Sequence, residues 1–529
     1  MNLNLYEMRL KRKNISRLFM AIFVIVLAGF FITKYLVTSK IESYVENLPN
    51  HIDLKYSDID LQIFSGSLNL DQVMLTIKGQ TTDDVNAQIK LKSIKIENLS
   101  YLDYLFKDDI TIETIALLQP KITYYHNDKV KNESYNSVFK NNLGKTIRIN
   151  AFEAQNTEVE VLNIENDSLM FSTENLDFKL NSIASNSLES KDFPIEFETL
   201  SLTSENLMYS LSEYENLSIS SLAITTQNAG FSNVELKTKY SKSELSKRIE
   251  SERDHFDLRI ASVDINNYQL KSILSSNASF TSENININFP EFHIYRDKLI
   301  ADDLTRKPLY SKMLRSLKFG LNLKELMVNK AKIIYEENVK SDSAPGKLQF
   351  SELDATIKNI TNLKSASDVT SISISSNFMK DTPLNVNWNF DVNDVNDEFI
   401  FKAEIGMLKA EHLNAFMQPN LNLKLEGELI KTYFTIDGNA NTSQIDLKTE
   451  YDQFDIIILK ENGKEKNKFL SGLINLFIAE DSKDDDDRFR QSDTKTVERD
   501  KTKSIFNFVW QNAKSGLISA MAGDGEKDN

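Results

Sequence analysis

Apolar and polar residues alternate along most of this chain, a pattern typical of half-buried β-strands. In the stretch YSDIDLQIFSGSLNL, which begins at Tyr56, Ile59 and Leu61 alternate with polar residues. A Ser-Gly-Ser segment at 65–67 interrupts the alternation, which resumes at Leu68. This pattern predicts two strands joined by a turn. Because apolar surface is unfavourable in water, the apolar faces of such strands need a covering partner.

The alternation recurs in a longer pattern with apolar residues at relative positions 0, 2, 5 and 7. About three such segments are expected by chance in a chain of this length and composition. At least eight occur, and they begin at Leu54, Ile89, Ile110, Ile195, Leu217, Ile287, Leu321 and Leu348. The step from position 2 to position 5 would turn later side chains to the other face of a regular strand. We therefore expect an extra residue there, a β-bulge that bends the strand.

In three of these segments apolar residues also fall at positions 12 and 14. We interpret the gap from 7 to 12 as a short turn, followed by the antiparallel partner strand. The sequence thus predicts a mainly β fold, with an elongated, curved antiparallel sheet and only a few short helices. The in-phase apolar residues are the candidates for lining its apolar face: Ile59, Leu61, Ile110, Ile112, Ile115, Leu117, Leu321, Leu323, Leu326 and Val328.

Two architectures satisfy this alternation equally well. In a sandwich the apolar face packs on a second sheet, so the candidate residues are ordinary core. In an open groove the same face receives an apolar ligand. The alternation alone does not distinguish them.

The N-terminal region predicts a membrane anchor. Five basic residues between 9 and 17 precede the uncharged segment Leu18–Ile32. Continued to Val37, the segment has 20 residues, which span about 30 Å as a helix, one hydrocarbon thickness. The basic flank predicts a cytoplasmic N-terminus and an exported body, with Lys34 reaching the far interface. The alternative is a cleaved signal peptide, with Val37 and Ser39 as the small residues before the cleavage site.

The C-terminal region predicts two helices separated by a charged segment. Lys468–Ala479 is apolar, and residues 480–503 are a charge-rich linker that contains Asp484–Asp487. These four acids lack the spacing of a calcium loop, so we interpret them as a solvated acidic loop. Ser504–Met521 has apolar residues at helical spacing, which predicts an amphipathic helix that either contacts a membrane or caps the β body. Its candidate contact residues are Ile505, Phe506, Val509, Trp510 and Leu517.

These features divide the chain into five parts. Residues 1–38 form the basic flank and anchor, 39–300 an N-terminal β region and 301–479 a C-terminal β region. The charged linker (480–503) and the C-terminal helix with its tail (504–529) complete the chain.

Composition argues against several classes of function. The formal net charge of −15 disfavours nucleic acid, whose phosphates attract clustered Lys and Arg. The absence of Cys excludes disulfides, cysteine-ligated metals and a cysteine nucleophile. The five histidines are scattered without ligand-like spacing, and the sequence contains no Gly-rich phosphate loop, GxSxG or HExxH motif. We therefore expect a protein that is not an enzyme and has no cofactor or bound metal.

Three regions of the chain together carry a resemblance to a known family. The first comprises LKYSDIDLQIFSGSLNLDQVMLTI from Leu54 and IKLKSIKIENLSYLDYLFKDDITIETIALLQPKITYY from Ile89. The second is KPLYSKMLRSLKFGLNLKELMVNKAKIIYEE from Lys307. The third begins with IGMLKAEHLNAF at Ile405 and includes KFLSGLINLF and SIFNFVWQNAKSGL. In this order they resemble the AsmA-like family of Gram-negative envelope proteins, which is related to the TamB-type repeating β-groove proteins, and the sequence looks like versions from Bacteroidota.

This resemblance implies a single-pass inner-membrane protein whose β body lies in the periplasm as a long groove with an apolar floor. It also implies phospholipid as the ligand, and a role in moving it towards the outer membrane and in maintaining the envelope. The alternative is a non-enzymatic assembly or scaffold factor for outer-membrane or other envelope proteins, acting through exposed strand edges.

Overall fold

The computed structural model describes residues 31, 34–35, 38–39, 42–43, 45–79, 83–100, 109–127, 146–185, 195–271, 278–363, 369–460, 482 and 489–521. The described chain is mainly β, as the alternation predicts. It divides into two compact units, Met1–Met208 and Tyr209–Asn529. This division lies within β10 (Thr199–Ser210), whereas the sequence places the boundary between its two β regions at 300/301.

The first unit is built on a sheet whose strands mostly pair with their neighbours in sequence. β1 and β2 both pair with β3, β3 pairs with β4, and β7 pairs with β8, which pairs with β9. β4 pairs with both β5 and β6, and these two strands also both pair with β7. The strands are β1 Ile52–Lys55, β2 Asp58–Gln62, β3 Ser67–Lys78, β4 Val85–Glu97, β5 Asp109–Leu118, β6 Lys121–His126, β7 Thr146–Asn163, β8 Leu169–Ser185 and β9 Ile195–Glu196.

The second unit continues in the same manner from β11 to β26. β11 to β13 pair in order, β13 pairs with β15 and β16, both of these pair with β17, and β17 to β21 pair in order. β23 then joins β21 to β24, and β25 and β26 lie along the far edge of β24. The strands are β11 Glu215–Thr225, β12 Ala229–Thr238, β13 His255–Asn266, β14 Gln269–Lys271, β15 Ser279–Asn288, β16 Glu291–Asp297, β17 Gly320–Asn338, β18 Gly346–Thr361, β19 Thr370–Phe378, β20 Thr382–Phe390, β21 Phe399–Ile405, β22 Leu408–Lys409, β23 Leu423–Gly438, β24 Thr442–Ile458, β25 Arg490–Gln491 and β26 Lys495–Glu498.

The pairing is mixed, which corrects the prediction of a purely antiparallel sheet. β5 and β6 are parallel to β7, and β15 and β16 are parallel to β17, while the other pairs named above are antiparallel. In each case two consecutive strands lie end to end beside one long strand. They are separated by a residue with positive φ followed by a buried proline: Gln119-Pro120 between β5 and β6, and Phe289-Pro290 between β15 and β16. The backbone bonds at the two breaks also correspond, because the Pro120 carbonyl accepts from Glu158 and the Pro290 carbonyl from Lys332, both at 2.8 Å. The same arrangement of broken strand and parallel neighbour therefore occurs once in each unit.

The structure is irregular at the predicted bulge and again farther along the strand. The register of β17 with β15 and β18 skips Lys324, and Leu323 and Leu326 on either side of it belong to one apolar cluster. Because residues three apart in a regular strand point to opposite faces, this irregularity keeps both side chains on one face, as the pattern predicts. The register also shifts between Val328 and Ile333, next to Lys330, which has a positive φ of 52°. The interpretation of positions 7 to 12 as a turn before an antiparallel partner is wrong for β17, which runs through this gap as one continuous strand.

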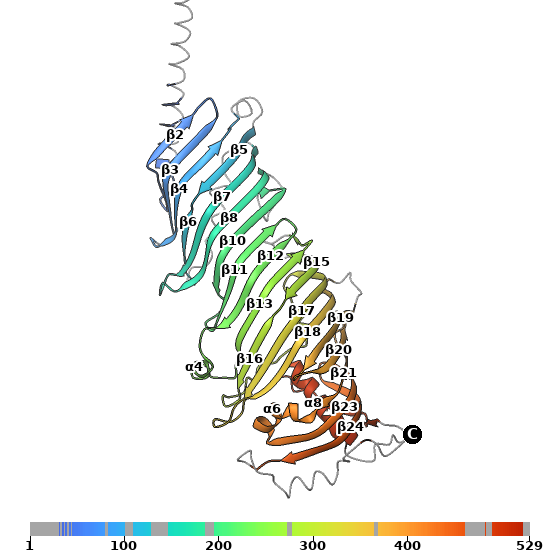
Figure 1. Ribbon diagram of the computed structural model, residues 1–529. Coiled ribbons are helices and arrows are strands. Elements are labelled where there is room, and N and C mark those ends of the chain that lie inside the picture. Colours follow the sequence, from blue (N-terminus) through green and yellow to red (C-terminus); the bar gives the residue numbers. More distant parts are fainter. Residues whose placement is uncertain are drawn as a thin grey trace, which may run out of the picture. The chain divides into compact units, whose positions relative to one another are not determined.

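Four helices are described in the second unit: α4 Lys242–Ser246, α5 Tyr310–Arg315, α6 Ala410–Leu421 and α8 Ile505–Met521. α6 packs mainly on β18 and β23, and α8 mainly on β24 (Figure 1). The largest cluster of buried apolar residues lies between strands β19–β24 and the helices α5 and α8.

The predicted anchor falls largely outside the described residues. The residues described between 31 and 46 are helical. Within the part of the chain that the structure describes, no helix is long and apolar enough to cross a membrane. The predicted helix at Lys468–Ala479 and the acidic run Asp484–Asp487 also lie outside the described residues.

Candidate functional site

Apolar side chains in the first unit form rows that run across its strands. Because directly opposed residues in neighbouring strands point to the same face, the register fixes these rows. One row crosses six strands and consists of Ile59, Leu70, Ile94, Leu117, Ala154 and Phe178. A second lies beside it and consists of Leu61, Leu68, Ile96, Ile115, Phe152 and Leu180.

The second unit carries longer rows of the same kind. Row A crosses eleven strands from β11 to β24 and consists of Leu222, Phe231, Val263, Ile287, Val328, Ala355, Ile374, Val386, Ala403, Phe434 and Leu447. Row B crosses ten strands and consists of Ala229, Ile265, Ile285, Leu326, Ile357, Ile372, Trp388, Phe401, Ile436 and Ile445. At about 4.8 Å between strands, row A is about 48 Å long. This is about three times the 15 Å that one leaflet's acyl chains span.

A third row, row C, lies on strands β11 to β19. It consists of Leu217, Leu236, Leu258, Phe292, Ile333, Phe350 and Phe378. The aromatic pair Phe350–Phe378 has ring centroids 5.1 Å apart.

Rows A and B are most completely buried at their C-terminal end. On β12 and β13, Phe231, Val263 and Ile265 are half-buried, whereas Leu222, Ala229 and Ile285 in the same stretch are buried. At the other end, Ile436 and Ile445 are 0% exposed. We call the stretch of rows A, B and C on β11–β17 the open face.

Helices close the C-terminal end of the same rows. Trp388 of row B contacts Tyr310 of α5, with ring centroids 5.3 Å apart, and lies 5.8 Å from the Phe401 ring. Leu314 of α5 and Ile357 of row B pack against both the large cluster between β19–β24, α5 and α8 and the smaller cluster around Leu323. The open face and the closed core are therefore parts of one continuous apolar surface.

The structure distributes the candidate lining residues between these rows. In the first unit, Ile59 and Leu117 share one row and Leu61 and Ile115 the other, whereas Ile110 and Ile112 lie farther along β5, opposite Ile147 and Ile149. In the second unit, Leu321, Leu323 and Leu326 belong to one cluster and Val328 to the next.

The C-terminal members of rows A and B were not among the sequence candidates. Their signal was present, because Val386, Trp388 and Phe390 alternate with polar residues. Alternation shows which side chains of one strand share a face, however, and not which residues of the next strand lie opposite them. The rows can therefore be identified only once the register is known.

The helix at Ile505–Met521 lies against β24. Ile505 is buried, Val509 and Leu517 are half-buried, and all three pack in the closed core. Phe506 and Trp510 point away from the sheet and are 63% and 37% exposed.

Two short strands occupy part of the predicted charged linker. β25 and β26 pair with β24, and the backbones of Ser482 and Ser492 bond to Tyr451 and Leu447. These contacts cover the edge of β24 from Thr442 to Tyr451. A covered edge cannot pair with a strand of another protein.

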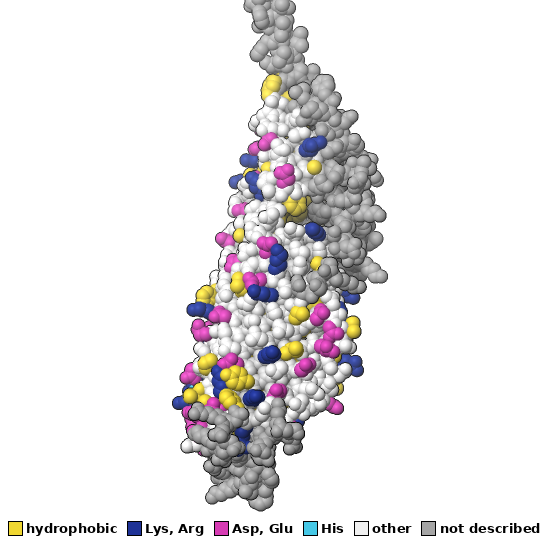
Figure 2. Space-filling view, turned by 90° about the vertical axis from the view of Figure 1, so that its right-hand side faces the viewer, with side chains coloured by type: hydrophobic (Ala, Val, Ile, Leu, Met, Phe, Trp, Pro, Cys, Tyr) yellow, Lys and Arg dark blue, Asp and Glu magenta, His cyan; other side chains and the backbone are white. Residues whose placement is uncertain are grey.

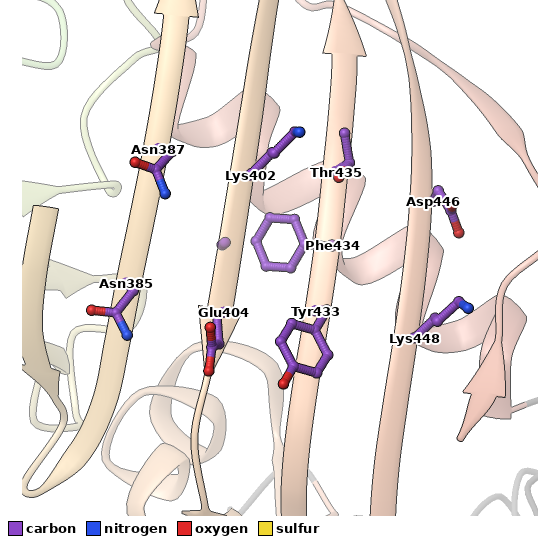
Figure 3. Close-up of a pocket in the computed structure, with 10 residues that line it drawn as sticks. Asn385, Asn387, Lys402, Glu404, Tyr433, Phe434, Thr435, Asp446 and Lys448 are labelled. Carbon is purple, nitrogen blue, oxygen red and sulfur yellow. The ribbon is translucent and has the colours of Figure 1, made fainter. Parts of the chain in front are cut away.

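A polar hollow of about 350 Å³ lies on the other face of strands β20–β24 (Figure 3). Its charged side chains lie on β21 (Lys402 and Glu404) and on β24 (Asp446 and Lys448), with β23 between them. Across the sheet Lys402 is followed by Asp446, and Glu404 by Lys448. Glu404 is paired with Lys431. We interpret this hollow as the solvated outer face, because its polar residues Tyr433 and Thr435 alternate along β23 with Phe434 and Ile436, which pack in the closed apolar cluster.

The charges on the surface are also mixed in sign. On the side shown in Figure 2, Lys and Arg side chains are interspersed with Asp and Glu, without a large patch of one sign. Among the described residues, no group of three or more His, Asp or Glu side chains is placed to hold a metal ion.

The apolar rows are therefore our candidate for a binding surface in the described part of the chain. Comparisons with known proteins do not identify its ligand: no family model and no curated protein matches the sequence.

Proposed function

We propose that this protein shields phospholipid acyl chains on the open face while the lipid passes between the inner and outer membranes of a Gram-negative envelope. The observation that carries the proposal is the continuity of rows A and B, which include half-buried side chains on β12 and β13, where no second sheet formed by the described residues packs on them. Burial of each methylene contributes about 0.8 kcal/mol, so a 16-carbon chain gains about 12 kcal/mol without any specific polar contact.

The sequence supports the same function. The basic-flanked apolar segment Leu18–Val37 would hold the protein in the inner membrane, with its β body in the periplasm. The resemblance to the AsmA-like family points to phospholipid as the ligand. The alternative role, as an assembly factor for outer-membrane proteins, needs a free strand edge, and the edge of β24 is covered from Thr442 to Tyr451.

Crosslinking in living cells tests this proposal. A photoreactive benzoylphenylalanine replaces Leu258, a half-buried member of row C, and the cells are irradiated. We expect phospholipid adducts on the purified full-length protein, detected by mass spectrometry, because the side chain lies where an acyl chain would lie. The matched control is the same replacement at Arg259, the next residue of β13, which is exposed on the opposite face; it should give no lipid adduct.

Adducts of Leu258 with another protein, and none with lipid, would favour the assembly factor. Equal lipid labelling at both positions would show only contact with a nearby membrane, and would contradict a lipid-binding face.

A further inference from the structure

Rows A and B do not stop where the open face ends, but continue beneath α8. Their last members, Leu447 and Ile445, are 1% and 0% exposed. α8 approaches them through Gly516, where a Cβ atom would lie 3.0 Å from the Leu447 Cβ and from the Ile445 Cδ1. The helix thus occupies the surface that an acyl chain would reach by continuing along the rows.

The side of α8 that faces the sheet combines polar and apolar residues. Asn512 is 0% exposed, and its side-chain carbonyl accepts a hydrogen bond from the Ser443 hydroxyl at 2.9 Å. Ser519 accepts one from the Asp493 backbone at 3.1 Å. Leu517, Ala520 and Met521 pack in the apolar clusters on the sheet.

The outward side of α8 is mostly apolar. Its exposed positions recur every four residues at Phe506, Trp510, Lys514 and Ile518. Three of the four are large apolar residues, and Phe506 and Ile518 are 63% and 53% exposed. A helix on the surface of a protein normally turns such residues inward. A row that combines Trp, other apolar residues and one Lys matches the face of a helix that lies in a bilayer interface.

The segment before α8 is fastened to the body. The Lys503 ammonium donates to Asp302 at 2.9 Å and lies 3.9 Å from Glu252, which Lys298 also contacts. Burial raises the pKa of Glu252, whereas its hydrogen bond with Asp302, together with Lys503, lowers the pKa of Asp302 to about 2. The backbone of Lys307 donates to the Lys501 carbonyl at 2.7 Å. These contacts leave the start of the helix attached if the rest of it moves.

We propose that α8 is a lid over the C-terminal end of the acyl-chain-binding rows, and that contact with a phospholipid bilayer opens it. This inference rests on the proposed function. On opening, the outward row enters the bilayer interface, and Ile436, Ile445 and Leu447 become available to a lipid that leaves or enters the rows.

The absence of cysteine from the chain makes the lid directly testable. Ile445→Cys places a single thiol beneath α8 in the full-length protein, held soluble by an amphipol. We expect a maleimide to react slowly in buffer and about tenfold faster after addition of phosphatidylethanolamine–phosphatidylglycerol vesicles, because the open population rises. The matched control is Ala331→Cys, which is equally buried in β17 but not beneath α8; its rate should not change.

A second variant tests the outward row. Trp510→Ser in the Ile445→Cys background should keep the slow reaction in buffer and lose the acceleration by vesicles. Should Ile445→Cys fail to fold, Ala520→Cys, which is 0% exposed on the helix itself, serves for the same measurement.

An unchanged rate with vesicles, or acceleration that survives Trp510→Ser, would overturn the lid. The crosslinking experiment separates this failure from that of the proposed function. If lipid adducts form at Leu258 but vesicles do not change the reaction rate of the thiol at position 445, the open face binds lipid and α8 stays closed.

Discussion

Replacement of Trp388 by alanine is expected to lower the free energy of unfolding of the second unit by about 3–5 kcal/mol. Trp388 is 5% exposed in row B, and its ring lies within 6.3 Å of the rings of Tyr310, Phe390, Phe399 and Phe401. Removing the indole leaves a cavity between the sheet and α5 that these rings cannot all fill. Urea denaturation followed by far-ultraviolet circular dichroism measures the loss.

The chain provides a matched control, because it contains two tryptophans. Trp510→Ala removes the same group from the outward side of α8, where it is 37% exposed, and should cost less than about 1 kcal/mol. Equal losses for the two variants would contradict the assignment of Trp388 to the closed core and of Trp510 to the outward row.

Gly427→Ala is expected to be similarly damaging, with a loss of about 2–4 kcal/mol from backbone strain and steric overlap. Gly427 has a φ of +90° within β23, where the register with β24 shifts. A Cβ atom there would lie 2.1 Å from the Gln453 carbonyl oxygen, so β23 and β24 would have to separate. The midpoint of thermal unfolding should fall accordingly.

Gly230→Ala is the matched substitution in another strand interior. The nearest atom to its added Cβ is the Asp264 Oδ1 at 3.7 Å, an ordinary contact. Because alanine also restricts the unfolded chain, we expect this variant to be neutral or up to about 1 kcal/mol more stable than the parent. If Gly230→Ala instead destabilised the protein as much as Gly427→Ala, the effect at 427 could not be attributed to the bulge.

The fold class could be read from the sequence because alternation is a local property. Segments such as Ile110–Leu117 show which side chains share a face before any neighbour is known. Strand continuity could not be read in this way. The gap between Leu326-Val328 and Ile333 looks like a turn, yet β17 crosses it with a bulge at Lys330, whose positive φ no composition signal marks.

The candidate surface was predictable only in part, for a related reason. The sequence assigns Leu323 and Trp388 to strand faces with equal ease, but one lies at the boundary of the open face and the other beneath α5. What decides between them is the position of helices that are distant in sequence from the strands they cover. Ile445, for example, is covered by Gly516 across 71 residues of chain.

The broken strand with its parallel neighbour occurs in both units, which suggests how a sheet of this kind can become wider in evolution. In each copy the broken strand pairs on its other side with an antiparallel strand, β4 or β13. The long parallel strand likewise pairs on its other side with an antiparallel strand, β8 or β18. Duplication of such a cassette adds about four strand positions, or roughly 19 Å, without creating a new edge or altering either end. The width of the sheet can therefore increase in evolution by a fixed amount with each duplication.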